Sequence, residues 1–162
     1  MDERDIKIIK KIAEIGEPSP KAIEEATGIP KSTIHYRLEN LREEGIIKDG
    51  LFTIDLEKVG LNLTVITEVN AEYSEEYHEE VGQKLSDIEG VNQVYFTAGD
   101  TDFIVIAHFA SREMVEDLIS SYERIDEIER TSTNFVITTI KNERTPFRDF
   151  ELDTLTDLVD PE

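Results

Sequence analysis

The sequence contains no cysteine, which excludes disulfide frameworks and thiolate metal sites and favours a reducing compartment. It has no apolar run close to the roughly 18 residues that a membrane span needs. Its first residues, MDERDIKIIKK, lack the apolar stretch of a signal peptide. These absences predict a soluble, cytoplasmic protein that has no membrane partner.

Basic residues are also scarce, and the shortage is uneven. The chain has 17 Lys and Arg against 37 Asp and Glu, but residues 1–50 hold 9 against 11 and residues 51–162 hold 8 against 26. This split indicates two units with different tasks, of which the first can approach a polyanion at little electrostatic cost. The acidity of the second favours a cytoplasm with very high salt, where the Debye length falls to roughly 3 Å. An ordinary acidic protein is the alternative.

Apolar residues at helical spacing predict three helices in the first 45 residues. The first runs from about Asp2 to Ile15, the second lies between Ser19 and Gly28, and the third between Pro30 and Gly45. Two short apolar runs then flank Asp49-Gly50, a dipeptide typical of tight hairpins. Three helices followed by a hairpin is the order of a winged helix-turn-helix.

The following residues change to the two-residue period of strands. Residues 55–62 read as a hinge, and from Leu63 apolar and polar residues alternate. A helix is predicted over about 75–88, two strands over 91–98 and 102–109 around a GDT turn, a helix over 111–125 and a last strand over 131–140. This βαββαβ order is ferredoxin-like. The polar tail carries spaced apolar residues, so it covers a neighbour or is partly disordered.

We therefore predict an α+β protein with four parts. They are a winged helix-turn-helix over residues 1–54, a hinge over 55–62, a ferredoxin-like domain over 63–143 and an acidic C-terminal tail over 144–162.

The third helix has the character of a recognition helix. With Ile34, Leu38 and Leu41 turned inward, its outward side chains are of kinds that hydrogen-bond to bases and phosphates: Ser32, Thr33, His35, Tyr36 and Asn40. Basic residues that could reach the DNA backbone are Lys31, Arg37 and Arg42, with Lys48 in the wing. A small helical bundle with a polar surface is the alternative.

Two features disagree with DNA binding. Glu24 lies in the middle of the second helix, where a small residue usually allows tight helix crossing. Glu39 and Glu43 lie on the outward face of the third helix and would repel phosphate.

Four stretches carry a resemblance to a known family: LREEGII, TIDLEKVGLNL, VYFTAGDTDFIV and IERTSTNFVITTIK. In this order they resemble the Lrp/AsnC family of feast/famine transcriptional regulators, from Asp2 to about Lys141. The resemblance implies a DNA-binding head joined to a domain that senses a ligand and forms dimers through its sheet. It also implies further assembly into tetramers or octamers, and an amino-acid effector bound between dimers near residues 97–102.

The chemistry of residues 97–102 fits an effector site. Gly99 lets a ligand approach the backbone closely, and Asp100 or Asp102 could pair with an ammonium group. The expected effector-binding residues are Thr97, Ala98, Gly99, Asp100, Asp102 and Thr133. A plain polar turn is the alternative, and Thr101 stands where the family often has an aromatic residue.

No pattern in the sequence indicates catalysis. It contains no nucleophile–base pair, Walker loop or zinc-ligand spacing, so neither a metal nor a cofactor is expected. His78 lies in an acidic helix and His108 in an apolar strand. The sequence therefore predicts a double-stranded DNA-binding regulator. A small-molecule-binding module without regulation and a dimeric ferredoxin-like enzyme are the alternatives.

Overall fold

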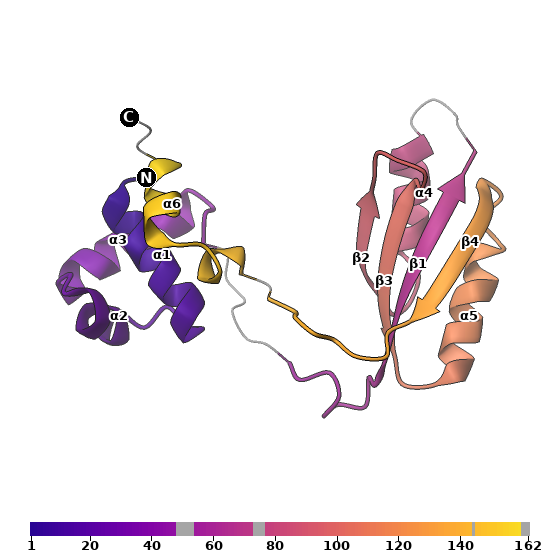
Figure 1. Cartoon of the computed structure of the whole chain (residues 1–162), viewed down its shortest axis with the longest axis horizontal. Coiled ribbons are helices and arrows are strands. Elements are labelled where there is room, and N and C mark those ends of the chain that lie inside the picture. Colours follow the sequence, from indigo (N-terminus) through magenta and orange to yellow (C-terminus); the bar gives the residue numbers. More distant parts are fainter. Residues whose placement is uncertain (48–53, 73–76, 144, 160–162) are drawn as a thin grey trace. The chain divides into compact units, whose positions relative to one another are not determined.

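The computed structural model describes residues 1–47, 54–72, 77–143 and 145–159, and the chain forms two compact units. The first unit, here called the head, combines residues 1–53 with the C-terminal residues 141–162. The second unit spans residues 54–140. Figure 1 shows the elements of each unit.

Three helices form the core of the head, as the sequence predicts. They are α1 (Glu3–Ile15), α2 (Pro20–Thr27) and α3 (Lys31–Glu43). α1 begins with a capping box, in which the Asp2 side chain accepts the backbone N–H of Asp5 and the Asp5 side chain accepts that of Asp2. The core consists of Ile8, Ile12, Ile23, Ile34 and Leu38. The predicted hairpin around Asp49-Gly50, with Lys48, lies outside the described residues.

The C-terminal tail covers a second apolar side of α1. Ile6 is buried although it lies about 200° around the helix from the core residue Ile8. The tail elements η1 (Pro146–Arg148) and α6 (Leu152–Asp157) contact α1, and Leu155 of α6 is buried. The Lys10 Nζ donates to the Phe150 carbonyl at 2.5 Å. The sequence left two alternatives for the tail, covering a neighbour or partial disorder. Residues 145–159 cover a neighbouring element, α1.

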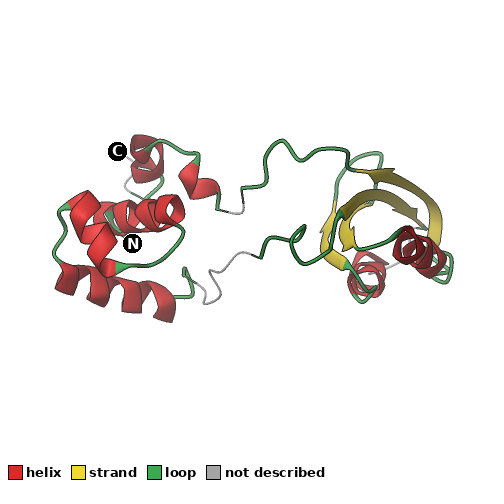
Figure 2. Ribbon diagram, turned by 90° about the horizontal axis from the view of Figure 1, so that it is seen from below, coloured by secondary structure: helices red, strands yellow, loops and turns green. Residues whose placement is uncertain are grey.

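The second unit is a four-stranded antiparallel sheet with two helices. Its elements are β1 (Leu63–Ala71), α4 (Tyr77–Ser86), β2 (Val91–Phe96), β3 (Phe103–Phe109), α5 (Arg112–Tyr122) and β4 (Ile128–Phe135). The strand order is β2-β3-β1-β4, and all neighbouring strands are antiparallel. Figure 2 shows both helices on one side of the sheet. The ferredoxin-like fold is confirmed.

Alternation along β1 and β3 explains why the helices cover only one face. Val65, Val69 and Val105 face the helices and are fully buried, whereas Ile66 and Ile106 face the open side and are half-buried. The core also contains residues from both helices: Val81, Leu85, Val115, Leu118 and Tyr122. Ile119 of α5 is exposed.

The last strand differs from the prediction in its limits. The β-branched run after Phe135 favoured a strand over 131–140, but β4 spans Ile128–Phe135. The Val136 N–H still donates to the Thr64 carbonyl, next to Leu63, where β1 begins. Beyond that point β1 offers no partner, and Ile137 and Ile140 are almost fully exposed.

Within the described residues, no helix has the length and apolar character needed to cross a membrane.

Candidate nucleic-acid interface and effector loop

The inward and outward faces of α3 are arranged as predicted. Ile34, Leu38 and Leu41 are buried, which fixes the rotation of the helix about its axis. Lys31, Ser32, His35, Tyr36 and Arg42 are exposed, while Thr33 and Asn40 are half-buried. Tyr36 is 64% exposed, an unusual placement for a large aromatic side chain. This face therefore presents hydroxyl, imidazole and amide groups outward.

Glu24 caps the amino-terminal end of α3. Its Oε1 accepts the backbone N–H of Lys31 at 2.8 Å, across the turn between α2 and α3. Pro30 is the N-cap residue and has no side-chain acceptor, so the carboxylate satisfies one of the free N–H groups at the helix start. Glu24, which disagreed with the prediction of DNA binding, is thus part of the turn that joins α2 to α3. The same carboxylate places negative charge where a phosphate would bind.

Arg37 holds α3 against the start of α1. Its guanidinium contacts Asp2 at 2.8 Å and Asp5 at 2.6 Å, and its side chain is only 19% exposed. The hydrogen bond to Asp5 raises the pKa of Arg37. For Asp2, burial would raise the pKa, but hydrogen bonds from the Asp5 backbone and from Arg37 outweigh it and lower the pKa.

These contacts disagree with the role predicted for Arg37. A phosphate contact would require the guanidinium to leave two carboxylates, one of which belongs to the capping box of α1. Arg37 therefore packs the head in this structure, and its contact with a DNA phosphate stays a prediction. The outward charge on α3 then consists of Lys31 and Arg42 against the exposed Glu39 and Glu43.

The predicted effector loop joins β2 to β3 and is fastened to the end of β1. The Thr97 hydroxyl donates to the Thr101 carbonyl, and the Thr97 N–H donates to the Asp102 carbonyl at 2.8 Å. Asn70 Nδ2 donates to the Asp100 carbonyl at 2.7 Å. The tip of the loop, formed by Ala98, Gly99 and Asp100, is exposed. The loop therefore offers a free carboxylate and free backbone on a fixed base.

Two of the predicted effector-binding residues are engaged within the chain. Asp102 is buried, and its Oδ2 accepts the backbone N–H of Ala71 at 2.9 Å. The Thr133 hydroxyl lies 3.0 Å from that of Thr67, on the helix-covered face of the sheet. The structure thus brings Thr97, Gly99 and Asp100 together in one loop. Thr133, in contrast, forms its hydrogen bond with Thr67.

Sequence reasoning missed Asn70, the residue that holds the loop from outside it. The alternation of residues along β1 could have indicated this contact, because it puts Asn70 on the open face of β1, next to the β2–β3 turn. The described residues contain no cluster of three or more His, Cys, Asp or Glu that could hold a metal ion.

Comparison with known families agrees with this architecture. Residues 1–48 match the winged helix-turn-helix DNA-binding family, and residues 64–146 match the Lrp/AsnC ligand binding domain. The two parts define a transcriptional regulator with a DNA-binding head and a ligand-binding domain. The chain belongs to the Lrp/AsnC family.

Relatives and solved structures agree with this assignment. The chain is 32% identical over 141 residues to the HTH-type transcriptional regulator FL11 of Pyrococcus horikoshii, a match covering 87% of this chain and 92% of the relative. In fold it resembles the transcriptional regulator NMB0573 of Neisseria meningitidis in complex with L-Met (TM-score 0.83, 20% identity, 96% and 99% of the two chains). It also resembles AsnC of Escherichia coli (TM-score 0.75, 21% identity, 88% and 95%).

Proposed function

We propose that this chain is a sequence-specific regulator that reads double-stranded DNA with the outward face of α3. The observation that carries the proposal is the capped and rotationally fixed α3, which presents Ser32, His35 and Tyr36 in its first two turns. In helix-turn-helix proteins these turns enter the major groove and reach base edges. Lys31 and Arg42 supply phosphate contacts, and Lys48 does so from the predicted wing. The protein acts in the cytoplasm and is not an enzyme.

The open face of the sheet supports dimerisation. Ile66, Ile104 and Ile106 lie there half-buried, and Tyr95 beside them is 52% exposed. An apolar patch of this kind on one face of a sheet is typical of a protein–protein interface. A second copy of the chain covers this face in the proposed homodimer, and dimers assemble into tetramers or octamers. A dimer presents two heads, as a two-fold symmetric operator requires.

The exposed loop tip supports an amino-acid effector. The Asp100 carboxylate suits an ammonium group, and the backbone at Gly99, where an added Cβ would meet no atom within 4 Å, leaves room for a carboxylate. Asn70 and Asp102 hold the loop in position for this role. Asp102 is therefore a positioning residue in the proposal, and Asp100 is the ligand contact.

We expect one of the standard amino acids to raise the melting temperature of the second unit, because a ligand that binds only the folded state stabilises it by mass action. Asp100→Asn should remove most of the shift. Asp126→Asn, an exposed position after α5, is the matched control and should retain it. If no amino acid shifts the melting temperature or changes DNA affinity, the loop is a plain turn.

Glu24 should limit DNA affinity, because its carboxylate occupies the anion position at the start of α3. Glu24→Gln keeps an oxygen acceptor for Lys31 N–H but removes the charge. We expect it to tighten binding to duplex DNA by roughly 2–10-fold at low salt and to steepen the dependence of affinity on salt. Glu25→Gln, on the next residue of α2 and exposed, is the control. Equal or weaker binding by Glu24→Gln would contradict this role.

The acidity of the chain supports work in a cytoplasm of roughly molar salt. The second unit holds 5 Lys and Arg against 19 Asp and Glu, so its surface charges repel one another at low ionic strength. We expect its melting temperature to keep rising with potassium chloride above the concentrations that screen ordinary proteins. DNA binding should survive an increase from 50 to 200 mM salt that costs an ordinary basic protein ~10³–10⁵ in affinity. A flat melting temperature with a steep loss of binding would contradict salt adaptation.

A further inference from the structure

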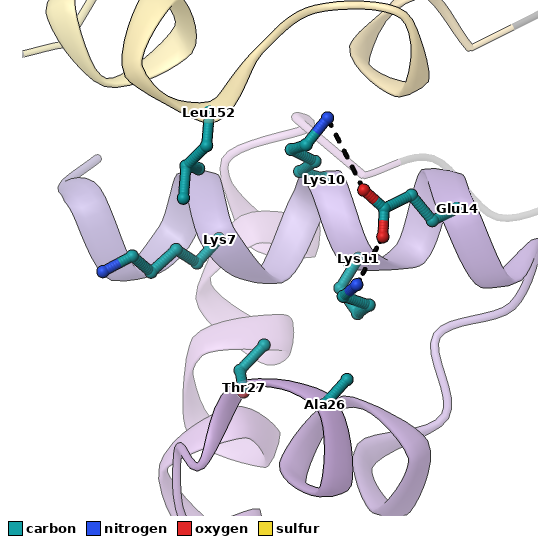
Figure 3. A pocket seen from close by; sticks show the side chains of 7 residues that line it. All are labelled: Lys7, Lys10, Lys11, Glu14, Ala26, Thr27 and Leu152. Carbon is teal, nitrogen blue, oxygen red and sulfur yellow. Dashed lines mark hydrogen bonds and ion pairs between the residues drawn. The ribbon is translucent and has the colours of Figure 1, made fainter.

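The head contains a cavity of ≈ 310 Å³ that neither the DNA-binding face nor the effector loop explains. Three elements line it: α1 contributes Lys7, Lys10, Lys11 and Glu14, α2 contributes Ala26 and Thr27, and α6 of the tail contributes Leu152. Figure 3 shows these side chains around the cavity. Its volume is at the lower end of the range of small-molecule sites.

The charge of the lining is opposite to that of the chain. Three lysines and one glutamate surround the cavity, whereas acidic residues outnumber basic ones by 37 to 17 in the whole sequence. Lys7 is paired with Glu3 at 2.5 Å, outside the cavity lining. Lys10 and Lys11 share the single carboxylate of Glu14, as the two dashed lines in Figure 3 show. One positive charge of this pair is therefore uncompensated within the lining.

The two lysines also retain hydrogen-bonding capacity. An ammonium group has three N–H donors. Among the described residues, Lys10 contacts Glu14 and the Phe150 carbonyl, and Lys11 contacts Glu14 alone. Their side chains are only 18% and 28% exposed, so water reaches them less than at the surface. The hydrogen bond from Lys11 lowers the pKa of the Glu14 carboxyl group, which favours its charged form beside the two lysines.

The rest of the lining limits what the cavity can accept. The Thr27 hydroxyl donates to the Ile23 carbonyl and accepts the Ile29 N–H, so it is already used. Ala26 and Leu152 offer small apolar contacts only. We propose that this cavity binds a small, multiply charged anion that carries phosphate or carboxylate groups, held by the N–H groups of Lys10 and Lys11 that Glu14 leaves free.

The C-terminal tail completes this site. Leu152 forms part of the wall, and the Phe150 carbonyl fixes the position of Lys10. An anion between Lys10 and Lys11 would therefore link the tail to α1 and α2 and stabilise the head with its tail. The site is independent of the effector loop, which lies in the other unit, so its test does not depend on the proposed amino-acid effector.

Pyrophosphate and citrate are suitable probes, because one carries phosphate and the other carboxylate groups. We expect at least one of them to raise the melting temperature of the head in the full-length protein by about 4 °C or more at ten times its Kd. Total ionic strength is held constant with potassium chloride, since salt alone stabilises an acidic chain. Titration calorimetry under the same conditions gives the Kd.

Variants of the lysines locate the site. Lys11→Gln should weaken the binding of the anion at least 10-fold, and Lys10→Gln with Lys11→Gln should abolish it. Lys21→Gln, an exposed lysine of α2 outside the cavity, is the matched control and should change nothing. The proposal is wrong if neither anion shifts the melting temperature beyond matched potassium chloride, or if the double variant retains the shift.

A DNA phosphate could supply the same chemistry as a free anion, and a competition experiment separates the two sources. If a DNA phosphate enters the cavity, pyrophosphate will displace duplex DNA at constant ionic strength and Lys11→Gln will weaken DNA binding. If the natural ligand is a free small anion, DNA affinity will be the same for Lys11→Gln and Lys21→Gln. Both results support an anion site and differ only in its source.

Discussion

Gly90→Ala should destabilise the second unit by about 2–5 kcal/mol, the largest loss we expect from a single methyl group. Gly90 has a φ of +85°, which costs a residue with a Cβ about 1–2 kcal/mol. An added Cβ would also lie 2.2 Å from Cε1 of Phe109, a buried core residue. Overpacking of this kind costs about 1–3 kcal/mol. Phe109 cannot easily yield, because the core surrounds its ring.

Urea denaturation followed by circular dichroism measures the effect, and Gly82→Ala is the matched control. At Gly82, in α4, an added Cβ would be 3.6 Å from the ring of Phe103, an ordinary contact. Alanine is also the better helix former by about 1 kcal/mol, so this variant should be neutral or more stable. A loss below about 0.5 kcal/mol in Gly90→Ala would show that the turn before β2 differs from the one described.

Leu155→Ala should destabilise the head by about 2–4 kcal/mol, although the residue lies in the C-terminal tail. Leu155 is 2% exposed, and truncation of a buried leucine removes its transfer free energy and leaves a cavity. A helix of six residues such as α6 is not stable by itself, so its docking on α1 depends on such contacts. Losing them should expose Ile6 and undock the tail.

Hydrogen exchange of α1 and α6, measured together with denaturation, separates undocking from global unfolding. Leu158→Ala in the same tail is the control, because Leu158 is 72% exposed and its truncation should change stability by less than about 0.5 kcal/mol. Equal stability of the two variants, with unchanged exchange in α1, would mean that the tail does not contribute to the head.

The sequence was sufficient to predict the order of the helices and strands. It also predicted which face of most of them is buried. Helical spacing of Ile34, Leu38 and Leu41 fixed the inward side of α3, and alternation in β1 separated Val65 and Val69 from Ile66. Both patterns reflect local geometry, in which one residue's direction follows from its neighbours. The apolar periods therefore predicted the winged-helix head and the ferredoxin-like domain, apart from the wing, which lies outside the described residues.

Contacts between residues distant in the sequence could not be predicted in this way. A helical wheel predicts a phosphate contact for Arg37, but it cannot show the ion pairs of Arg37 with the capping box of α1, which lies more than 30 residues away. Glu24 reads as an obstacle until the turn after α2 brings it to Lys31 N–H. The end of β4 depends on where β1 begins, and the tail's position depends on a second apolar side of α1.

Sequence reading by α3 is tested most directly by selection of duplex DNA from a random pool with the full-length protein at high potassium chloride. We expect enrichment of a two-fold symmetric motif whose half-sites lie roughly 34–36 Å apart or at a multiple of that spacing. Ser32→Ala and Tyr36→Ala should each relax the preference at particular positions by ~1–3 kcal/mol, while Lys21→Gln leaves the motif unchanged. Absence of any enriched motif, or a motif unaffected by both α3 variants, would contradict sequence reading by α3.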